Sequence, residues 1–68
     1  MTVINDVKTT LAGLKTAQAS FETFALSTDN QQAKQLYEQS AQDTQSIINN
    51  LESRVHEMEQ EEPQYKQQ

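Results

Sequence analysis

The 68-residue chain contains no cysteine, no tryptophan, and only one glycine, one proline and one histidine. Without cysteine it forms no disulfide, and a single histidine leaves little with which to build a structural metal site. Chains below roughly 70–80 residues usually need disulfides, a metal or self-association, because their core alone seldom supplies more than ~3–5 kcal/mol. We therefore expect this chain to associate with itself.

Long apolar runs and basic residues are scarce as well. No stretch approaches the ~20 apolar residues that a membrane-spanning helix needs, and the opening MTVINDVKTT lacks the basic and apolar segments of an export signal. We expect no direct membrane insertion and predict a cytoplasmic protein. Five Lys and Arg against ten Asp and Glu give a net charge of −5. Such a chain repels phosphate backbones, so we expect no nucleic acid as a partner.

The spacing of apolar residues predicts two helices. Gly13 and Pro63 are the only strong helix breakers, which favours long helices. Apolar residues recur at spacings of three and four over about 2–26 and again over about 29–61, which is typical of amphipathic helices. The positions that we expect in the core or in self-association are Ile4, Val7, Leu11, Leu14, Gln18, Phe21, Phe24, Tyr37, Ala41, Thr44, Ile48, Leu51, Val55 and Met58.

Residues 27–30, Ser-Thr-Asp-Asn, separate the two helices. All four types favour turns and caps, and Thr28 and Asp29 each precede a glutamine by three residues, the spacing of a capping box. So short a connection makes the helices antiparallel neighbours. We predict an all-α fold: an antiparallel two-helix hairpin over residues 1–62 that assembles into a four-helix bundle as a homodimer, followed by a flexible tail at 63–68.

Packing within this hairpin should place large side chains opposite small ones. We expect Phe21 and Phe24 to lie opposite Ala33, Ser40 and Ala41. Two helices shield only one side of each other, so an apolar groove should remain along the hairpin, and a second hairpin would close it.

Finer expectations concern single residues. At ~1.5 Å per residue the second helix is longer than the first, so Val55 and Met58 should project past their partner. Glycine inside a helix costs about 1 kcal/mol relative to alanine, which points to a close helix crossing at Gly13. Polar residues at heptad core positions commonly fix register, and we expect Gln18 and Thr44 to form such a pair.

The sequence contains no complete motif for catalysis or metal binding. His56 and Glu57 begin a zinc-protease pattern, but Gln60 occupies the place of the second histidine. Glu52 and His56 are four residues apart, which predicts an exposed pair on one helix face rather than a di-iron site. No serine or threonine has a recognisable base, and there is no phosphate-binding loop. We predict no catalytic, cofactor-binding or metal-binding residues, and a protein that is not an enzyme.

Three runs carry a family resemblance: VKTTLAGLKTAQASFETFAL, QQAKQLYEQSAQDTQSIINNLESRV and EEPQYK. In their order and distances they resemble domain of unknown function 1657, a family of short proteins of endospore-forming bacteria, over nearly the whole chain. The resemblance implies a forespore or spore context and an adaptor role, because genes of the family often lie beside those of spore membrane proteins. From the residues alone Tyr65 is expected to be idle, whereas the resemblance favours a docking element made of Glu61, Glu62, Pro63, Gln64 and Tyr65.

Two hypotheses of function remain. The first is a non-enzymatic helical interaction or adaptor protein that binds itself and a spore-associated protein. The alternative is a small acid-soluble spore protein that stores amino acids or coats DNA, which the length, the glutamine content and the resemblance favour. The acidic charge balance opposes the DNA-coating version.

Overall fold

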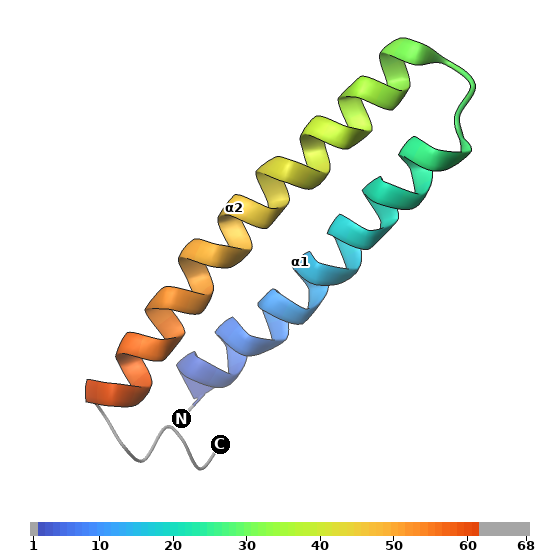
Figure 1. Cartoon of the computed structure of the whole chain (residues 1–68). Helices are drawn as coiled ribbons and strands as arrows, with labels where there is room; N and C mark the ends of the chain where they lie inside the picture. The colour runs from blue at the N-terminus through green and yellow to red at the C-terminus, as the bar shows by residue number, and fades with distance from the viewer. Residues whose placement is uncertain (1, 62–68) are drawn as a thin grey trace.

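The computed structural model of the chain describes residues 2–61, with side chains from Val3 onward. Its elements are two helices, α1 (Thr2–Ser27) and α2 (Gln31–Glu61). The start of α1 and the end of α2 lie at one end of the molecule, and the connection lies at the other (Figure 1). The predicted all-α antiparallel hairpin is confirmed, while its assembly into a bundle stays a prediction. The tail expected at 63–68 lies outside the described residues.

Asn30 caps the N-terminus of α2. Its Oδ1 accepts a hydrogen bond from the backbone N–H of Ala33 at 2.8 Å, which is the geometry of an N-cap. Thr28 Oγ1 accepts a hydrogen bond from the Asn30 N–H at 3.2 Å and holds the turn. The capping boxes expected at Thr28 and Asp29 are therefore wrong. Because Asn30 supplies the cap, α2 begins at Gln31 rather than at residue 29.

The C-terminus of α1 is also closed by local hydrogen bonds. The helix continues to Ser27, so the turn consists of residues 28–30 rather than 27–30. The Thr28 N–H donates to the Phe24 carbonyl at 3.0 Å. Lys34 Nζ reaches back from α2 and donates to the Ala25 carbonyl at 2.9 Å. These donors satisfy carbonyl groups that the end of a helix leaves unpaired, and the lysine places a positive charge at the negative end of the helix dipole.

The core is a narrow seam between the two helices. Most of its buried residues recur at intervals of seven, the spacing that keeps one line of side chains facing a partner helix. Four half-buried apolar residues, Val7, Leu14, Leu51 and Met58, pack against the largest of them. The buried residues are Ile4, Leu11 and Ala25 on α1 and Ala41, Thr44, Ile48 and Val55 on α2.

The two helices match in length more closely than expected. Val55 is buried in the same cluster as Ile4, which lies in the first turn of α1, and Met58 packs against that cluster. The expected overhang of Val55 and Met58 is therefore wrong. The later start of α2 moves its last turns level with the first turns of α1, and the ion pair between Lys8 and Glu59 fixes this register.

Gly13 is not at a helix crossing. A Cβ atom built on Gly13 would meet no neighbouring atom within 4 Å. The residue lies on the outer side of α1, in the middle of the helix. The close crossing that its cost predicted is wrong, and no contact in the described structure requires glycine at this position.

Gln18 and Thr44, the polar residues at expected core positions, form hydrogen bonds with other residues rather than with each other. Thr44 is buried and donates its hydroxyl to the Ser40 carbonyl at 2.7 Å, within its own helix. Gln18 Nε2 crosses to α2 and donates to Gln45 Oε1 at 2.8 Å. It also lies 3.4 Å from Glu22 Oε2. Gln18 therefore pairs with Gln45 instead of Thr44, because a glutamine side chain is long enough to reach past the core line.

Candidate interaction surfaces

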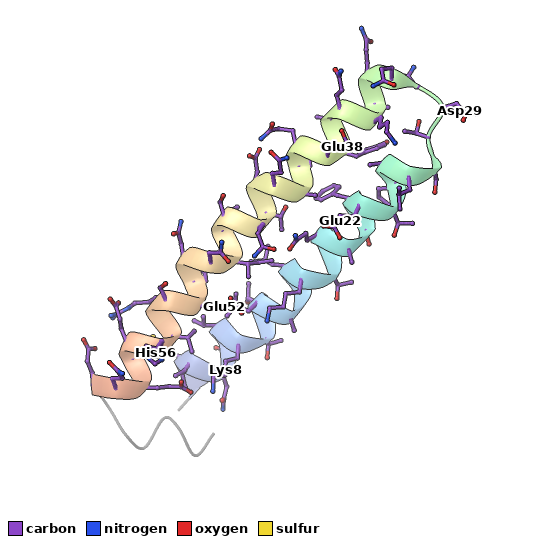
Figure 2. The ribbon with its side chains drawn as sticks, viewed as in Figure 1. Lys8, Glu22, Asp29, Glu38, Glu52 and His56 are labelled. Carbon is purple, nitrogen blue, oxygen red and sulfur yellow. The ribbon has the colours of Figure 1, made fainter. Side chains whose placement is uncertain are left out.

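The seam between α1 and α2 has two sides, and one of them carries charge. Lys8 Nζ lies 2.9 Å from Glu59 Oε2, and Lys15 Nζ lies 2.9 Å from Glu52 Oε2. On each helix these residues come four positions after a buried one, so they flank the core on a common side. We call this side the charged face: Lys8, Lys15, Glu22, Glu38, Gln45, Glu52, His56 and Glu59. Figure 2 labels five of these residues, Lys8, Glu22, Glu38, Glu52 and His56.

The interhelical ion pairs fix register more than they stabilise. The Lys8–Glu59 pair is partly buried and the Lys15–Glu52 pair is more exposed. Exposed pairs of this kind contribute about 0–1 kcal/mol each. The pair expected between Glu52 and His56 is wrong: Glu52 bonds across the seam to Lys15, while His56 Nε2 lies 3.1 Å from the side-chain amide of Gln60.

The two ends of the charged face differ. Beside the ion pairs, an open groove of about 450 Å³ runs past Lys15 and His56. Near the turn a larger open groove of about 600 Å³ is bordered by Glu22 and Glu38 and floored by Ala41. Among residues 2–61 neither of these two carboxylates pairs with a lysine or arginine. The charged face therefore carries ion pairs near the start of α1 and the end of α2, and carboxylates without a basic partner near the turn.

The opposite side of the seam is apolar. Val3, Phe24 and Ile47 each come one position before a buried residue, and Leu36 comes one before the half-buried Tyr37. One residue turns a helix by about 100°, which rotates these side chains away from the charged face. The exposed fraction is 59% for Val3, 47% for Phe24, 49% for Ile47 and 62% for Leu36.

Half-buried apolar residues fill the space between these exposed ones and the core. We call the whole set the apolar face. Of its four exposed members, only Phe24 was among the positions expected in the core or in self-association. The apolar face consists of the exposed Val3, Phe24, Leu36 and Ile47 and the half-buried Val7, Leu14, Phe21, Tyr37, Leu51 and Met58.

Aromatic rings gather at the turn end of the apolar face. The Phe24 and Tyr37 ring centroids are 5.5 Å apart with planes at 63°, and those of Phe21 and Phe24 are 6.5 Å apart at 80°. Both arrangements are edge-to-face, which aromatic rings prefer. The Phe24 ring therefore contacts another ring on α2, a contact that the expected packing of large rings against small residues did not include. Nearly half of Phe24 stays exposed.

Charged residues flank the apolar face on α2. Arg54 and Glu61 continue the line of Ile47 at intervals of seven, and Arg54 Nη1 lies 3.9 Å from Glu61 Oε1 and 3.5 Å from Glu57 Oε1. Glu61 is exposed and is the last described residue of α2. The rest of the docking element predicted from the resemblance, Glu62, Pro63, Gln64 and Tyr65, lies outside the described residues.

Sequence reasoning did not find the interhelical ion pairs. Their signal is present in the sequence, because Lys8 and Lys15 are seven residues apart, as are Glu52 and Glu59.

Within residues 2–61 no group of three His, Asp or Glu side chains lies close enough to hold a metal ion. No helix in that range has the length and apolar character to cross a membrane.

The fold and its two faces define a class: a short helical hairpin protein whose own chain leaves an apolar face uncovered in the described structure. The sequence model of a family described as "Protein of unknown function (DUF1657)" matches residues 7–55, more than half of the chain. The chain belongs to this family, which confirms the predicted resemblance, although the run EEPQYK lies beyond the matched residues. Comparisons with curated proteins and with solved structures gave no match.

Proposed function

We propose that this chain is a non-enzymatic helical interaction protein that acts by burying its apolar face against another polypeptide. The observation that carries the proposal is the row of large apolar side chains, about half exposed, beside a half-buried apolar stripe. Extended exposed apolar patches on a folded protein mark sites of protein or membrane interaction. Membrane-surface helices carry Lys and Arg beside their apolar side, whereas here the charged residues are mostly acidic.

The small core supports the same function. Only seven of the described residues are buried, and one of them is Thr44. A seam of this size leaves a chain of 68 residues marginally stable by itself. Covering the apolar face with another polypeptide adds the apolar burial that the hairpin lacks. Stability and binding are therefore coupled, as in proteins whose folded state depends on a partner.

A second surface remains for a second partner when the apolar face is covered. The exposed carboxylates of Glu57 and Glu61 lie at the end of α2, next to the predicted docking residues 62–65. In our proposal this acidic end binds a spore-associated protein, which makes the chain an adaptor. The support is the spore context that the family resemblance implies, together with the density of carboxylates at this end.

A pull-down from sporulating cells, followed by titration of the captured protein in purified form, tests the adaptor role. We expect the wild type to bind it and a variant ending at Glu62 to bind at least about tenfold more weakly, a loss of about 1.4 kcal/mol. Leu26→Glu serves as a control, because Leu26 is 82% exposed beside the groove near the turn, far from the acidic end. Equal affinity for the wild type and the shortened chain would show that residues 63–68 do not dock the partner.

Two further measurements separate this proposal from the other functions. We expect no shift in gel retardation with DNA at low salt, because a net charge of −5 opposes contact with phosphates. We also expect metal analysis of the purified protein to return no stoichiometric zinc or iron. A DNA shift would favour the coating function, and a stoichiometric bound metal would contradict the prediction that the chain has no metal site.

A further inference from the structure

We infer that the apolar face is covered by a second copy of this chain, turned end for end, so that two hairpins form a four-helix bundle with their charged faces outward. The inference rests on the proposed function, and it names the polypeptide that the apolar face binds. It also states an orientation, which neither the fold nor the family match contains.

The size of the apolar face fits a second copy. The hairpin measures 49 × 15 × 13 Å, and the apolar residues run from Val3 near one end to Leu36 near the other. One whole side of the hairpin, taken as a flat rectangle of 49 × 15 Å, has an area of roughly 700 Å², of the same order as the ~800 Å² per partner that a protein–protein interface of standard size buries. A second hairpin has the same length and the same kind of face, as a two-fold symmetric contact requires.

The placement of charge permits two acidic chains to meet on this face. The net charge of −5 opposes association between copies in general. However, Lys8, Lys15 and their glutamate partners lie on the opposite side of the seam. Arg54, at the edge of the apolar face, pairs with two glutamates of its own helix. Asp43, seven residues after Leu36, accepts a hydrogen bond from Gln39 Nε2 at 2.8 Å. These charged groups therefore each have a partner within their own hairpin, whereas an unpaired charge buried at the contact would cost several kcal/mol.

The uneven bulk of the apolar face sets the orientation. Phe21, Phe24, Leu36 and Tyr37 all lie in the half nearest the turn, and the two ring contacts hold three of them together. The opposite end carries smaller side chains such as Val3. Two such faces close along their whole length only when the bulky end of one meets the slimmer end of the other, because interiors pack to uniform density.

Sedimentation velocity on matched variants tests the covered face. We expect the wild type to sediment as a dimer of the 7.7 kDa chain at micromolar concentration. Ile47→Glu should raise the dimer dissociation constant by roughly a hundredfold or more, because it places an unpaired carboxylate in the interface. Leu26→Glu changes a more exposed apolar residue on the other side of the seam and should leave the dimer intact. A monomeric wild type, or dissociation by both variants alike, would overturn the inference.

A distance measurement tests the orientation on a protein that keeps its apolar face. The chain has no cysteine, so Asp29→Cys provides a unique site for a spin label in the exposed turn. In the end-for-end dimer the two labels should lie about 40 Å or more apart, given the 49 Å length, whereas turns at the same end would place them within roughly 25 Å, since packed helices are ~10 Å apart. Thr16→Cys, near the middle of α1, is the control, because its distance hardly depends on orientation.

The two experiments distinguish failure of this inference from failure of the proposed function. A short distance at position 29 overturns the end-for-end arrangement. A wild type that is monomeric yet binds another purified protein through residues including Leu36 overturns the second copy as occupant and leaves the interaction function standing.

Discussion

Replacing Gly13 with alanine should stabilise the protein. Gly13 lies in the middle of the 26-residue α1, and an added Cβ would meet no atom within 4 Å. The backbone has no positive φ at this residue. Alanine therefore introduces no strain and recovers the full helix-interior difference of about 0.8–1.0 kcal/mol, largely by reducing the freedom of the unfolded chain. For a domain of this size, 1 kcal/mol raises Tm by about 4–8 °C.

Thermal unfolding followed by far-UV circular dichroism measures this effect at a fixed protein concentration, since association also shifts Tm. Ala19→Gly is the matched control, because Ala19 is an exposed residue of the same helix and should lose about as much as Gly13→Ala gains. A lower Tm for Gly13→Ala would refute the reasoning. It would mean that a partner packs closely against the outer side of α1, which our assignment of the apolar face does not include.

Three further substitutions test the cap, the core and the polar core position. Asn30→Ala should cost about 1 kcal/mol in urea unfolding because it removes the acceptor of the α2 cap, whereas Asp29→Ala should change little. Ile48→Ala should lower the free energy of unfolding by about 2–5 kcal/mol and leave much of the chain unfolded by circular dichroism, because Ile48 is almost fully buried. Ile47→Ala, at an exposed neighbour, should weaken the dimer more than it lowers the helix content. Gln18→Leu should raise Tm and yield mixed oligomers in light scattering, because a polar core residue restricts register at a cost in stability.

The spacing of apolar residues was sufficient to predict the two helices and their antiparallel pairing. Ile4 and Leu11 on α1, and Ile48 and Val55 on α2, are apolar residues seven positions apart. This spacing is typical of helices that pack against each other along one line of side chains. The turn was predictable within one or two residues, because Ser, Thr, Asp and Asn all favour caps. For the same reason the sequence could not identify Asn30 as the cap: its neighbours compete, and the three-dimensional closure of the turn decides between them.

Contacts across the seam were harder to predict than contacts along a helix. Glu52 has a partner candidate four residues away in His56, but Lys15 on the other helix lies 2.9 Å from it. The choice depends on how α1 lies against α2, which the spacing of residues along one helix does not determine. For the same reason Val55 was expected to project from comparison of the helix lengths, and it is instead buried against the first turn of α1.

The separation of charge and apolar surface onto opposite sides of the seam implies that register and association are determined by different residues. Within one hairpin, the Lys8–Glu59 pair and the bond between Gln18 and Gln45 favour one alignment of α1 and α2, while they contribute little free energy because they are partly exposed. Between hairpins, apolar burial supplies the free energy of association, but it does not depend on the relative orientation of the two hairpins because the hydrophobic effect is non-directional. The uneven bulk of the apolar face then selects one orientation. Substitutions on the charged face should therefore change alignment within a hairpin without dissociating the dimer, and substitutions on the apolar face should do the reverse.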